Sequence, residues 1–218
     1  MRATLALALL LALEPAGLLR GADTIGIPRL TFTKEFPRSN PDYYRIELGE
    51  DGQARYFTAP PSTSSEDTGT INFRVSPRLA RQAFELAARL NYFRGAALET
   101  RKKVASMGKK TVVYESGAER SQAVFNYSEN SDAMALVELF EKISNTQQHL
   151  LALDRLTRFD KLGLMKQLLS LESALDKRDL AEPALLVPAL EEISRNNTYL
   201  HIAQQRARII LAKIYDQK

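Results

Sequence analysis

The segment YYRIELGEDGQARYFT, residues 43–58, has the pattern of an antiparallel β-hairpin. Apolar Tyr44, Ile46 and Leu48 alternate with polar side chains, as expected for a strand that buries one face. The run Gly49-Glu50-Asp51-Gly52 then predicts a turn, because the glycine of an Asp-Gly pair accepts a positive φ. Residues 53–58 form the return strand. Since hairpins build antiparallel sheets, this segment decides the fold class of the first half of the chain.

The same alternation occurs on both sides of this hairpin. It predicts strands at about residues 28–34 and 70–75, and a second hairpin formed by residues 109–115 and 120–127. Ser116-Gly117 is the turn of that second hairpin, with a dipeptide that also favours chain reversal. We therefore expect about five or six strands.

One helix interrupts the strands. Ser76 is a favourable N-cap, and Pro77 suits the first turn, where its missing N–H costs no hydrogen bond. Apolar residues then recur at helical spacing as far as Leu90, and we expect the helix to end near Asn91. Its apolar stripe should pack on one face of the sheet.

After Ser131 the apolar spacing is helical throughout. It predicts a long helix over residues 131–157 and shorter helices over residues 161–177, 183–195 and 199–215. Pro188 should either kink the third of these or lie in its first turn. Short connections favour antiparallel packing in a small bundle. The long helix could pack on the sheet with its first turns and on the bundle with its last.

The predicted fold class is α+β. An antiparallel sheet of about five or six strands with a packed helix is followed by a C-terminal all-helical region. We divide the chain into a signal peptide (1–22), an α+β sheet domain (23–128) and a helical bundle region (129–218). The composition is 44% hydrophobic and 26% charged, which is ordinary for a folded protein, so disorder is not expected.

The N-terminus has the features of a signal peptide. Arg2 supplies a positive charge, and residues 5–13 are an uninterrupted apolar run. Such a run fits the apolar region of about 7–15 residues in a signal peptide, whereas a membrane-spanning helix needs about 20. Ala16 and Ala22 are both small enough to precede the cleavage site. The other interpretation is a buried first helix of the mature fold.

Export would place the mature chain in the periplasm or outside a bacterial cell. No other segment approaches membrane-spanning length, so we expect no transmembrane segment in the mature chain. The absence of cysteine excludes disulfides, thiol catalysis and cysteine metal sites, and an exported eukaryotic domain would more often carry disulfides. Removal of Arg2, Arg20 and Glu14 with the leader lowers the formal net charge from +4 to +3, too little to indicate nucleic-acid binding.

No motif identifies a catalytic centre. His149 and His201 have no partner at metal-ligand spacing, and the sequence contains neither HExxH nor G-x-S-x-G. Gly108-Lys109-Lys110-Thr111 fails as a phosphate-binding loop, because Lys103 stands where a glycine is needed and a strand follows. We predict no catalytic, cofactor-binding or metal-ligating residues and lean against an enzyme. A hydrolase that uses two acidic residues stays open.

The clearest charge cluster is Arg101-Lys102-Lys103, with Lys109 and Lys110 close by. It could bind an anionic polymer or an acidic partner, or it could be a solvated connection between helix and hairpin. Tyr43 and Tyr92, if exposed, could mark a protein interface, because aromatic residues are enriched there. The candidate interaction surface therefore comprises Arg101, Lys102, Lys103, Lys109, Lys110, Tyr43 and Tyr92.

These observations favour a non-catalytic binding or interaction protein of the bacterial cell envelope. Its partner would be another envelope protein or a glycan. Two alternatives remain: a hydrolase of unrecognised type, and a secreted inhibitor or sensor module. In the last case residues 59–69, rich in proline and serine, or residues 101–110 would insert into the partner.

Several segments together resemble an uncharacterised family of exported bacterial proteins, a domain of unknown function. They are FTKEF (32–36), NPDYY (40–44), DG (51–52), LNYF (90–93), MGKKT (107–111) and FNY (125–127). The resemblance covers most of the mature chain and is more specific in the sheet half. It implies export and an α+β fold, and it supplies no catalytic residues.

Overall fold

The computed structural model describes residues 26–58 and 70–216. Six strands form one antiparallel sheet with the order β4-β3-β2-β1-β5-β6, so the predicted α+β class is confirmed. The strands are β1 (Arg29–Glu35), β2 (Tyr43–Gly49), β3 (Gln53–Phe57), β4 (Thr70–Arg74), β5 (Lys109–Ser116) and β6 (Glu119–Phe125). The predicted signal peptide and the predicted loop at residues 59–69 lie outside the described residues.

Both predicted hairpin turns are present. Gly52, with φ of 82°, lies between β2 and β3, and the carboxylate of Asp51 accepts a 3.0 Å hydrogen bond from the Gln53 N–H. Gly117, with φ of 57°, lies between β5 and β6. Glycine adopts positive φ angles at a lower steric cost than residues with a Cβ atom, so the two glycines favour chain reversal at these positions.

Strand β1 joins the two hairpins. Phe32 pairs with Ile46 of β2 on one side and with Val112 of β5 on the other. The two hairpins therefore become one sheet through a strand that precedes both of them in the chain.

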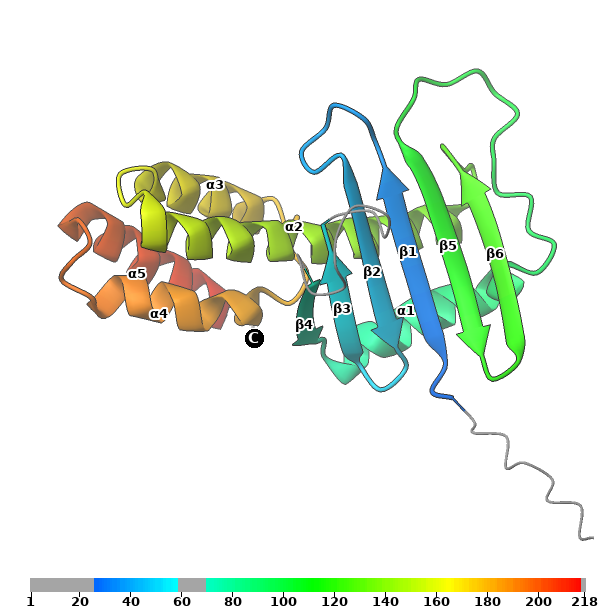
Figure 1. Cartoon of the computed structure of the whole chain (residues 1–218), viewed down its shortest axis with the longest axis horizontal. Helices are drawn as coiled ribbons and strands as arrows, with labels where there is room; N and C mark the ends of the chain where they lie inside the picture. The colour runs from blue at the N-terminus through cyan, green and yellow to red at the C-terminus, as the bar shows by residue number, and fades with distance from the viewer. Residues whose placement is uncertain (1–25, 59–69, 217–218) are drawn as a thin grey trace, which may run out of the picture.

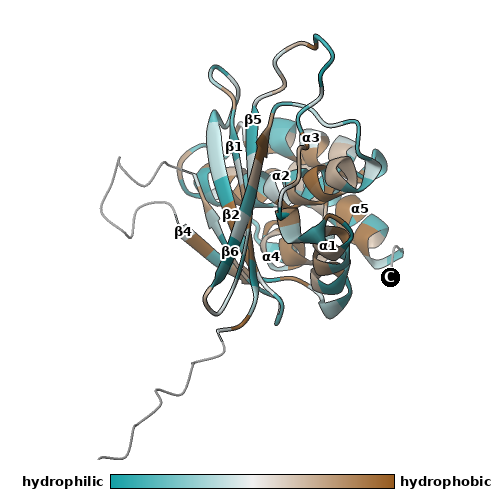
Figure 2. Ribbon diagram, turned by 90° about the vertical axis from the view of Figure 1, so that its right-hand side faces the viewer, coloured by the Kyte–Doolittle hydropathy of each residue, from teal (hydrophilic) through white to brown (hydrophobic). Residues whose placement is uncertain are grey.

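The helices of the described residues all lie on one side of the sheet (Figure 2). Helices α1 (Pro77–Arg89) and α2 (Ser131–Phe159) pack on this inner face, where the ring of Phe32 stacks on Phe140 with 5.1 Å between centroids. The alternate side chains of each strand point to the other face, against which no described helix lies. We call this second face the outer face of the sheet.

The N-terminus of α1 is also tied to the helical region. Ser76 accepts a 3.2 Å hydrogen bond from the Leu79 N–H, as its predicted capping role requires. The Glu182 carboxylate in turn accepts hydrogen bonds from the N–H and the hydroxyl of Ser76, at 2.9 and 2.6 Å. This contact joins segments 106 residues apart.

Helix α2 runs from behind the sheet into the helical region, which lies beyond the β4 edge (Figure 1). Its first turns, from Ala133 to Ile143, belong to the core under the sheet, whereas Leu153 and Leu156 belong to the core of the helical region. The predicted long helix therefore buries residues in both halves. The helical region continues with α3 (Leu164–Asp176), α4 (Val187–Arg195) and α5 (His201–Asp216).

Short 3-10 helices lie at Asn91–Phe93 and Pro183–Leu186. Pro188 lies in the first turn of α4, which is one of the two predicted placements; α4 begins at Val187, and the residues before it, predicted as part of the same helix, form the 3-10 helix. Among the described residues, no helix has both the length and the apolar character needed to cross a membrane.

Candidate functional site: the arginine-bearing outer face of the sheet

The outer face of the sheet carries an excess of positive charge. Among the described strand residues that point to this face, six are basic and three are acidic. The basic residues are Arg29, Arg45, Arg55, Arg74, Lys109 and Arg120, and the acidic ones are Glu35, Glu47 and Glu115. Three of the arginines gather around one of the glutamates.

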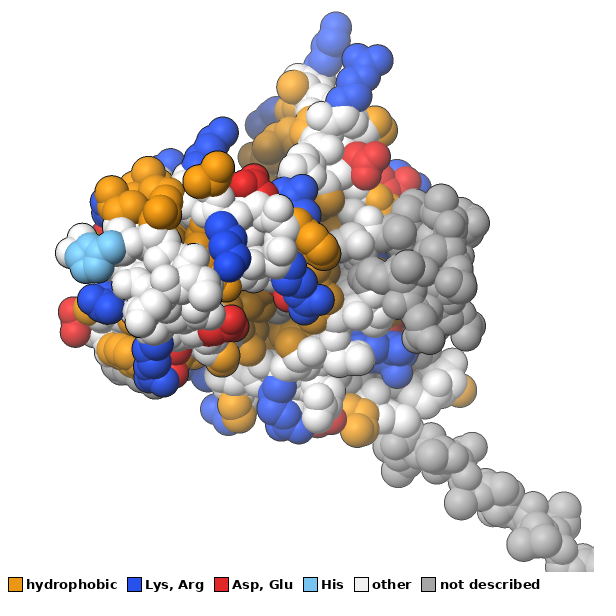
Figure 3. Space-filling view, turned by 60° about the vertical axis from the view of Figure 1, so that its left-hand side comes forward, with side chains coloured by type: hydrophobic (Ala, Val, Ile, Leu, Met, Phe, Trp, Pro, Cys, Tyr) orange, Lys and Arg blue, Asp and Glu red, His pale blue; other side chains and the backbone are white. Residues whose placement is uncertain are grey.

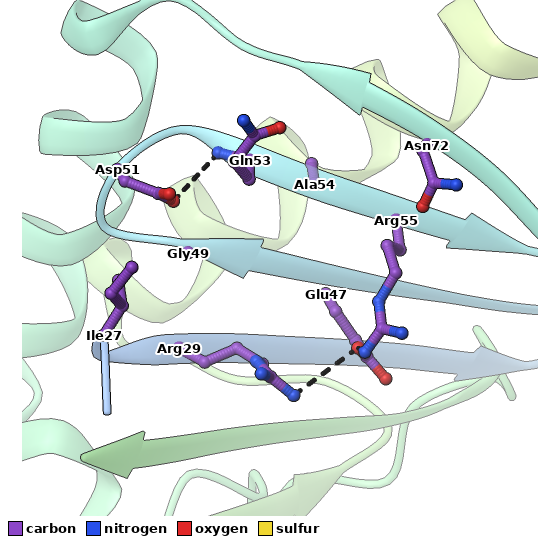
Figure 4. A pocket seen from close by; sticks show the side chains of 9 residues that line it. All are labelled: Ile27, Arg29, Glu47, Gly49, Asp51, Gln53, Ala54, Arg55 and Asn72. Atoms are coloured by element: carbon purple, nitrogen blue, oxygen red, sulfur yellow. Dashed lines mark hydrogen bonds and ion pairs between the residues drawn. The ribbon is translucent and has the colours of Figure 1, made fainter. Parts of the chain in front are cut away.

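Glu47, in the middle of β2, is the centre of this cluster. Arg55 lies directly opposite on β3 and donates a hydrogen bond of 2.5 Å to Oε2. Arg29 of β1 approaches the same oxygen to 3.7 Å, and Arg45, two residues earlier in β2, approaches Oε1 to 3.5 Å. Figure 4 shows Arg29 and Arg55 reaching Glu47 from either side. The cluster therefore spans the three neighbouring strands β1, β2 and β3.

The guanidinium groups largely cover the carboxylate. The Glu47 side chain is only 13% exposed, although it points away from the protein core. One carboxylate neutralises one guanidinium group, so the four side chains keep a formal charge of +2. Arg29 and Arg55 are about half exposed and are accessible to a ligand.

Arg45 is held in place by an aromatic ring. Its guanidinium carbon lies 4.0 Å from the centroid of the Phe57 ring, and that of Arg55 lies 5.6 Å from the same ring. Stacking on an aromatic face restricts an arginine without using its N–H groups. Within the part of the chain that the structure describes, Nε of Arg45 is buried and has no hydrogen-bond partner.

A shallow cavity of about 480 Å³ lies beside the cluster, towards the β2–β3 turn. Arg29, Glu47 and Arg55 form one side of it (Figure 4). Asn72 and Gln53 add amide groups from β4 and β3, and Ile27 adds an exposed apolar side chain. The lining thus combines amide groups with the two half-exposed arginines, whose formal charge is balanced by Glu47 and Asp51.

This arrangement suits the binding of an anion. A guanidinium group presents a planar pair of N–H donors that matches a carboxylate, and charge-assisted hydrogen bonds are about twice as strong as neutral ones. Because the cavity is shallow and the surrounding surface is a sheet face, an extended ligand fits better than a small enclosed one.

The predicted interaction residue Lys110 does not lie on the surface. It is 2% exposed, and its ammonium group donates hydrogen bonds to the carbonyls of Met107, Gly108 and Asn126 at 3.1, 3.1 and 2.7 Å. Burial lowers the pKa of Lys110. Its position in β5 places it on the inner face, so its role is to hold the loop before β5 and the chain after β6 together.

The other basic residues of the predicted surface are exposed, but they do not join the arginine cluster. Arg101, Lys102 and Lys103 lie in the connection before β5, where Lys102 pairs with Glu129. Lys109 lies on the outer face and pairs with Glu35 at 3.2 Å. These charges are therefore spread along a connection and a strand end.

The two predicted aromatic contacts are both half-buried. Tyr43 lies on the outer face at the start of β2, and burial raises the pKa of its hydroxyl. Tyr92 packs against Tyr114, with 4.3 Å between the ring centroids, and its backbone has a φ of 49°. Tyr92 thus completes packing beside β6, whereas Tyr43 shares a face with the arginines.

The two histidines have different surroundings. His149 shares a 2.8 Å hydrogen bond between its Nδ1 and the Gln167 side chain, and burial lowers the pKa of His149. His201 is exposed at the start of α5. Across residues 26–58 and 70–216, no group of three or more histidine, aspartate and glutamate side chains is placed to hold a metal ion.

No family model, curated protein or solved structure matches this chain. The interpretation of the site therefore depends on its geometry and charges alone.

Sequence reasoning did not single out Arg29, Arg45 and Arg55. Each occupies a polar position in an alternating strand, which is the usual place for a solvated charge. A signal was nevertheless present, because the Asp51-Gly52 turn places Glu47 opposite Arg55. Convergence of the other arginines depends on the neighbouring strand β1 and on the ring of Phe57.

Proposed function

We propose that this chain is an exported bacterial binding protein without catalytic activity. The outer face of its sheet binds an acidic segment of another envelope protein. The observation that carries the proposal is the convergence of Arg29, Arg45 and Arg55 on the single carboxylate of Glu47. The uncharacterised exported family that the sequence resembles supports the extracytoplasmic setting.

Energetics favour a partner with several carboxylates. The Glu47 carboxylate already interacts with all three guanidinium groups, so a single added anion would stabilise each of them less than it would a free arginine. The cluster nevertheless keeps two positive charges that Glu47 does not compensate. A ligand with carboxylates at neighbouring positions can engage Arg29 and Arg55 together, since they flank Glu47 from adjacent strands. An extended acidic peptide meets this requirement.

A binding titration tests the proposal. A fluorescein-labelled oligoglutamate peptide is the probe, with an oligoglutamine peptide of equal length as the neutral comparison. We expect the acidic peptide to bind and the neutral one not to bind. Affinity should fall steeply as salt rises from about 50 to 200 mM, because the contacts lie near the surface and are screened.

Two variants locate the binding surface. Arg29→Gln with Arg55→Gln should weaken peptide binding at least about tenfold, because two charge-assisted contacts are lost. Lys102→Gln with Lys109→Gln is the matched control, since it also removes two positive charges and these lysines pair with Glu129 and Glu35 outside the cluster. Equal loss in both variants would show a diffuse charge effect and would refute a defined site. Preference for an acidic polysaccharide over the peptide would identify a glycan as the partner class.

Export has its own test. Expression in a bacterial host, followed by fractionation and mass spectrometry of the purified protein, should find the chain outside the cytoplasm with an N-terminus after Ala16 or Ala22. Cytoplasmic protein that retains Met1 would refute the export part of the proposal.

A further inference from the structure

The far end of the helical region exposes large apolar side chains. Phe159 is 82% exposed and Leu162 is 81% exposed, and Leu200 and Ile202 are each 55% exposed. We call these four residues the apolar tip. Single exposed apolar residues are common, but a cluster of large ones marks an interaction surface.

The four residues lie in or next to two turns that lie side by side: Phe159 ends α2, Leu162 and Leu200 are in the turns, and Ile202 is in the first turn of α5. The α2–α3 and α4–α5 turns both lie at the end of the molecule remote from the sheet (Figure 1). Nζ of Lys161 lies 3.2 Å from the hydroxyl of Thr198 and 5.2 Å from the centroid of the Tyr199 ring. Figure 3 shows hydrophobic side chains gathered at this end beside the pale-blue histidine.

Both turns have their own hydrogen bonds. The Asp160 carboxylate accepts a 3.0 Å bond from the Gly163 N–H in the first turn. In the second turn, the side-chain oxygen of Asn196 accepts a 2.9 Å hydrogen bond from the Thr198 N–H. The backbone carbonyl of Asn196 accepts another from the side-chain amide of Gln204. The apolar side chains are therefore presented by an ordered scaffold, which reduces the entropy lost on docking.

Basic residues surround the apolar tip. Within residues 154–166 and 195–202, five side chains are basic and two are acidic, and His201 is also exposed. The basic residues are Arg155, Arg158, Lys161, Lys166 and Arg195, and the acidic ones are Asp154 and Asp160. Asp154 already pairs with Arg158 at 2.6 Å, Arg195 pairs with Glu191 at 3.2 Å, and Asp160 caps the turn. Arg155, Lys161 and Lys166 thus leave this end of the molecule with an excess of positive charge beside the protruding apolar groups, and we call the basic residues the positive ring.

We propose that the apolar tip docks onto an anionic lipid surface. Protruding Phe and Leu side chains can enter the boundary between headgroups and acyl chains, while the basic ring contacts acidic headgroups. Charge complementarity favours this occupant over a second copy of the chain, because two copies would bring two positive rings together. The arginine-bearing face of the sheet lies at the other end of the molecule and stays free for its own partner.

Vesicle co-sedimentation tests the proposal. The protein is purified from an exporting host with its N-terminus read by mass spectrometry, and is mixed with vesicles of phosphatidylcholine containing 30% phosphatidylglycerol or none. We expect sedimentation with the anionic vesicles only. Phe159→Ser with Leu162→Ser should reduce partitioning at least tenfold, and Arg155→Gln with Lys161→Gln should reduce it about fivefold for each charge removed.

Matched controls separate docking from other effects. Ile27→Ser with Val124→Ser removes exposed apolar groups from the sheet half and should leave vesicle binding unchanged. Arg29→Gln with Arg55→Gln should also leave it unchanged, so this proposal and the peptide-binding proposal fail separately. Circular dichroism establishes that each variant is folded.

Three results would overturn the proposal. The first is that the protein stays in the supernatant with anionic vesicles. The second is that the variant Phe159→Ser with Leu162→Ser sediments with these vesicles as much as the wild type does. The third is a dimer in sedimentation velocity that the same pair of substitutions dissociates, which would assign the apolar tip to self-association.

Discussion

The Arg55 guanidinium donates a 2.5 Å hydrogen bond to the Glu47 carboxylate directly across the β2–β3 ladder. Glu47 is therefore the counter-charge that holds three arginines together on one sheet face. The same carboxylate competes with any acidic ligand for those guanidinium groups. The Glu47 carboxylate thus stabilises the folded arginine cluster but weakens the binding of an acidic ligand to it.

Glu47→Gln should change fold stability and peptide affinity in opposite directions. Without the carboxylate, three like charges repel each other, and we expect the free energy of unfolding to fall by about 1 kcal/mol at low salt. The affinity for an acidic peptide should rise several-fold, because the guanidinium groups are released. Urea denaturation and peptide titration measure the two effects.

Glu35→Gln is the control for that substitution. Glu35 pairs with Lys109 at 3.2 Å on the same outer face, at the opposite end of β1 from Arg29. It should change stability and peptide binding little, because an isolated exposed ion pair contributes little. Weaker peptide binding by Glu47→Gln would contradict the role assigned to Glu47.

The local parts of the fold were predictable from the sequence. The alternation of apolar and polar side chains predicted the strands, and the turns at Gly52 and Gly117 predicted both hairpins. Ser76 and Pro77 gave the start of α1, because capping depends on neighbouring residues only. Within one hairpin the turn also sets the register, so the Glu47–Arg55 pair follows from the sequence.

The long-range parts were not predictable. Alternation shows which side chains share a face, but not that β1 lies between β2 and β5. The burial of Lys110 also depends on three carbonyls supplied by the loop before β5 and the chain after β6. A basic run in the sequence therefore looked like one surface although it contains a buried structural lysine.

Gln147 offers a test of a buried polar group without a partner. The residue is 0% exposed in α2, and within the described chain neither its Oε1 nor its Nε2 has a hydrogen-bond partner. Gln147→Leu should raise the free energy of unfolding by about 1 kcal/mol, because it removes an uncompensated desolvation cost. Urea denaturation measures the change.

The adjacent Gln148 provides the opposite expectation. Its amide donates to the hydroxyl of Tyr56, so Gln148→Leu should lower the free energy of unfolding by about 1 kcal/mol. A loss of stability in Gln147→Leu comparable to that in Gln148→Leu would show that Gln147 is hydrogen-bonded in solution.

Lys110→Met should be strongly destabilising. The substitution keeps the length of the apolar stem but leaves three carbonyls without the ammonium group. We expect a loss of about 2–3 kcal/mol, since each bond is charge-assisted and partly buried. Thermal and urea denaturation measure it. Lys109→Met, which removes an exposed pair with Glu35, should have little effect, and equal losses would refute the structural role of Lys110.

Alkaline pH should unfold the protein through two buried tyrosines. Burial raises the pKa of Tyr44 and of Tyr56 above the ordinary tyrosine value of about 10, and the Tyr56 hydroxyl lies 3.1 Å from the Ser144 hydroxyl. Above pH 10 the unfolded chain loses these protons while the folded chain keeps them. Their contribution to stability is therefore complete below pH 10 and is lost as the pH rises above it, by at most about 1.4 kcal/mol per pH unit for each tyrosine.

The variant Tyr44→Phe with Tyr56→Phe isolates this contribution. At pH 7 it should be less stable than the wild type, because Ser144 and Gln148 lose a partner. Between pH 10 and 12 the free energy of unfolding of this variant should nevertheless fall less steeply than that of the wild type. The variant lacks the two hydroxyl groups that ionise in the unfolded chain but stay protonated in the folded one. Urea denaturation across this range measures both slopes. Parallel slopes, or ultraviolet titration in which all eight tyrosines of the folded wild type ionise together, would contradict the assignment.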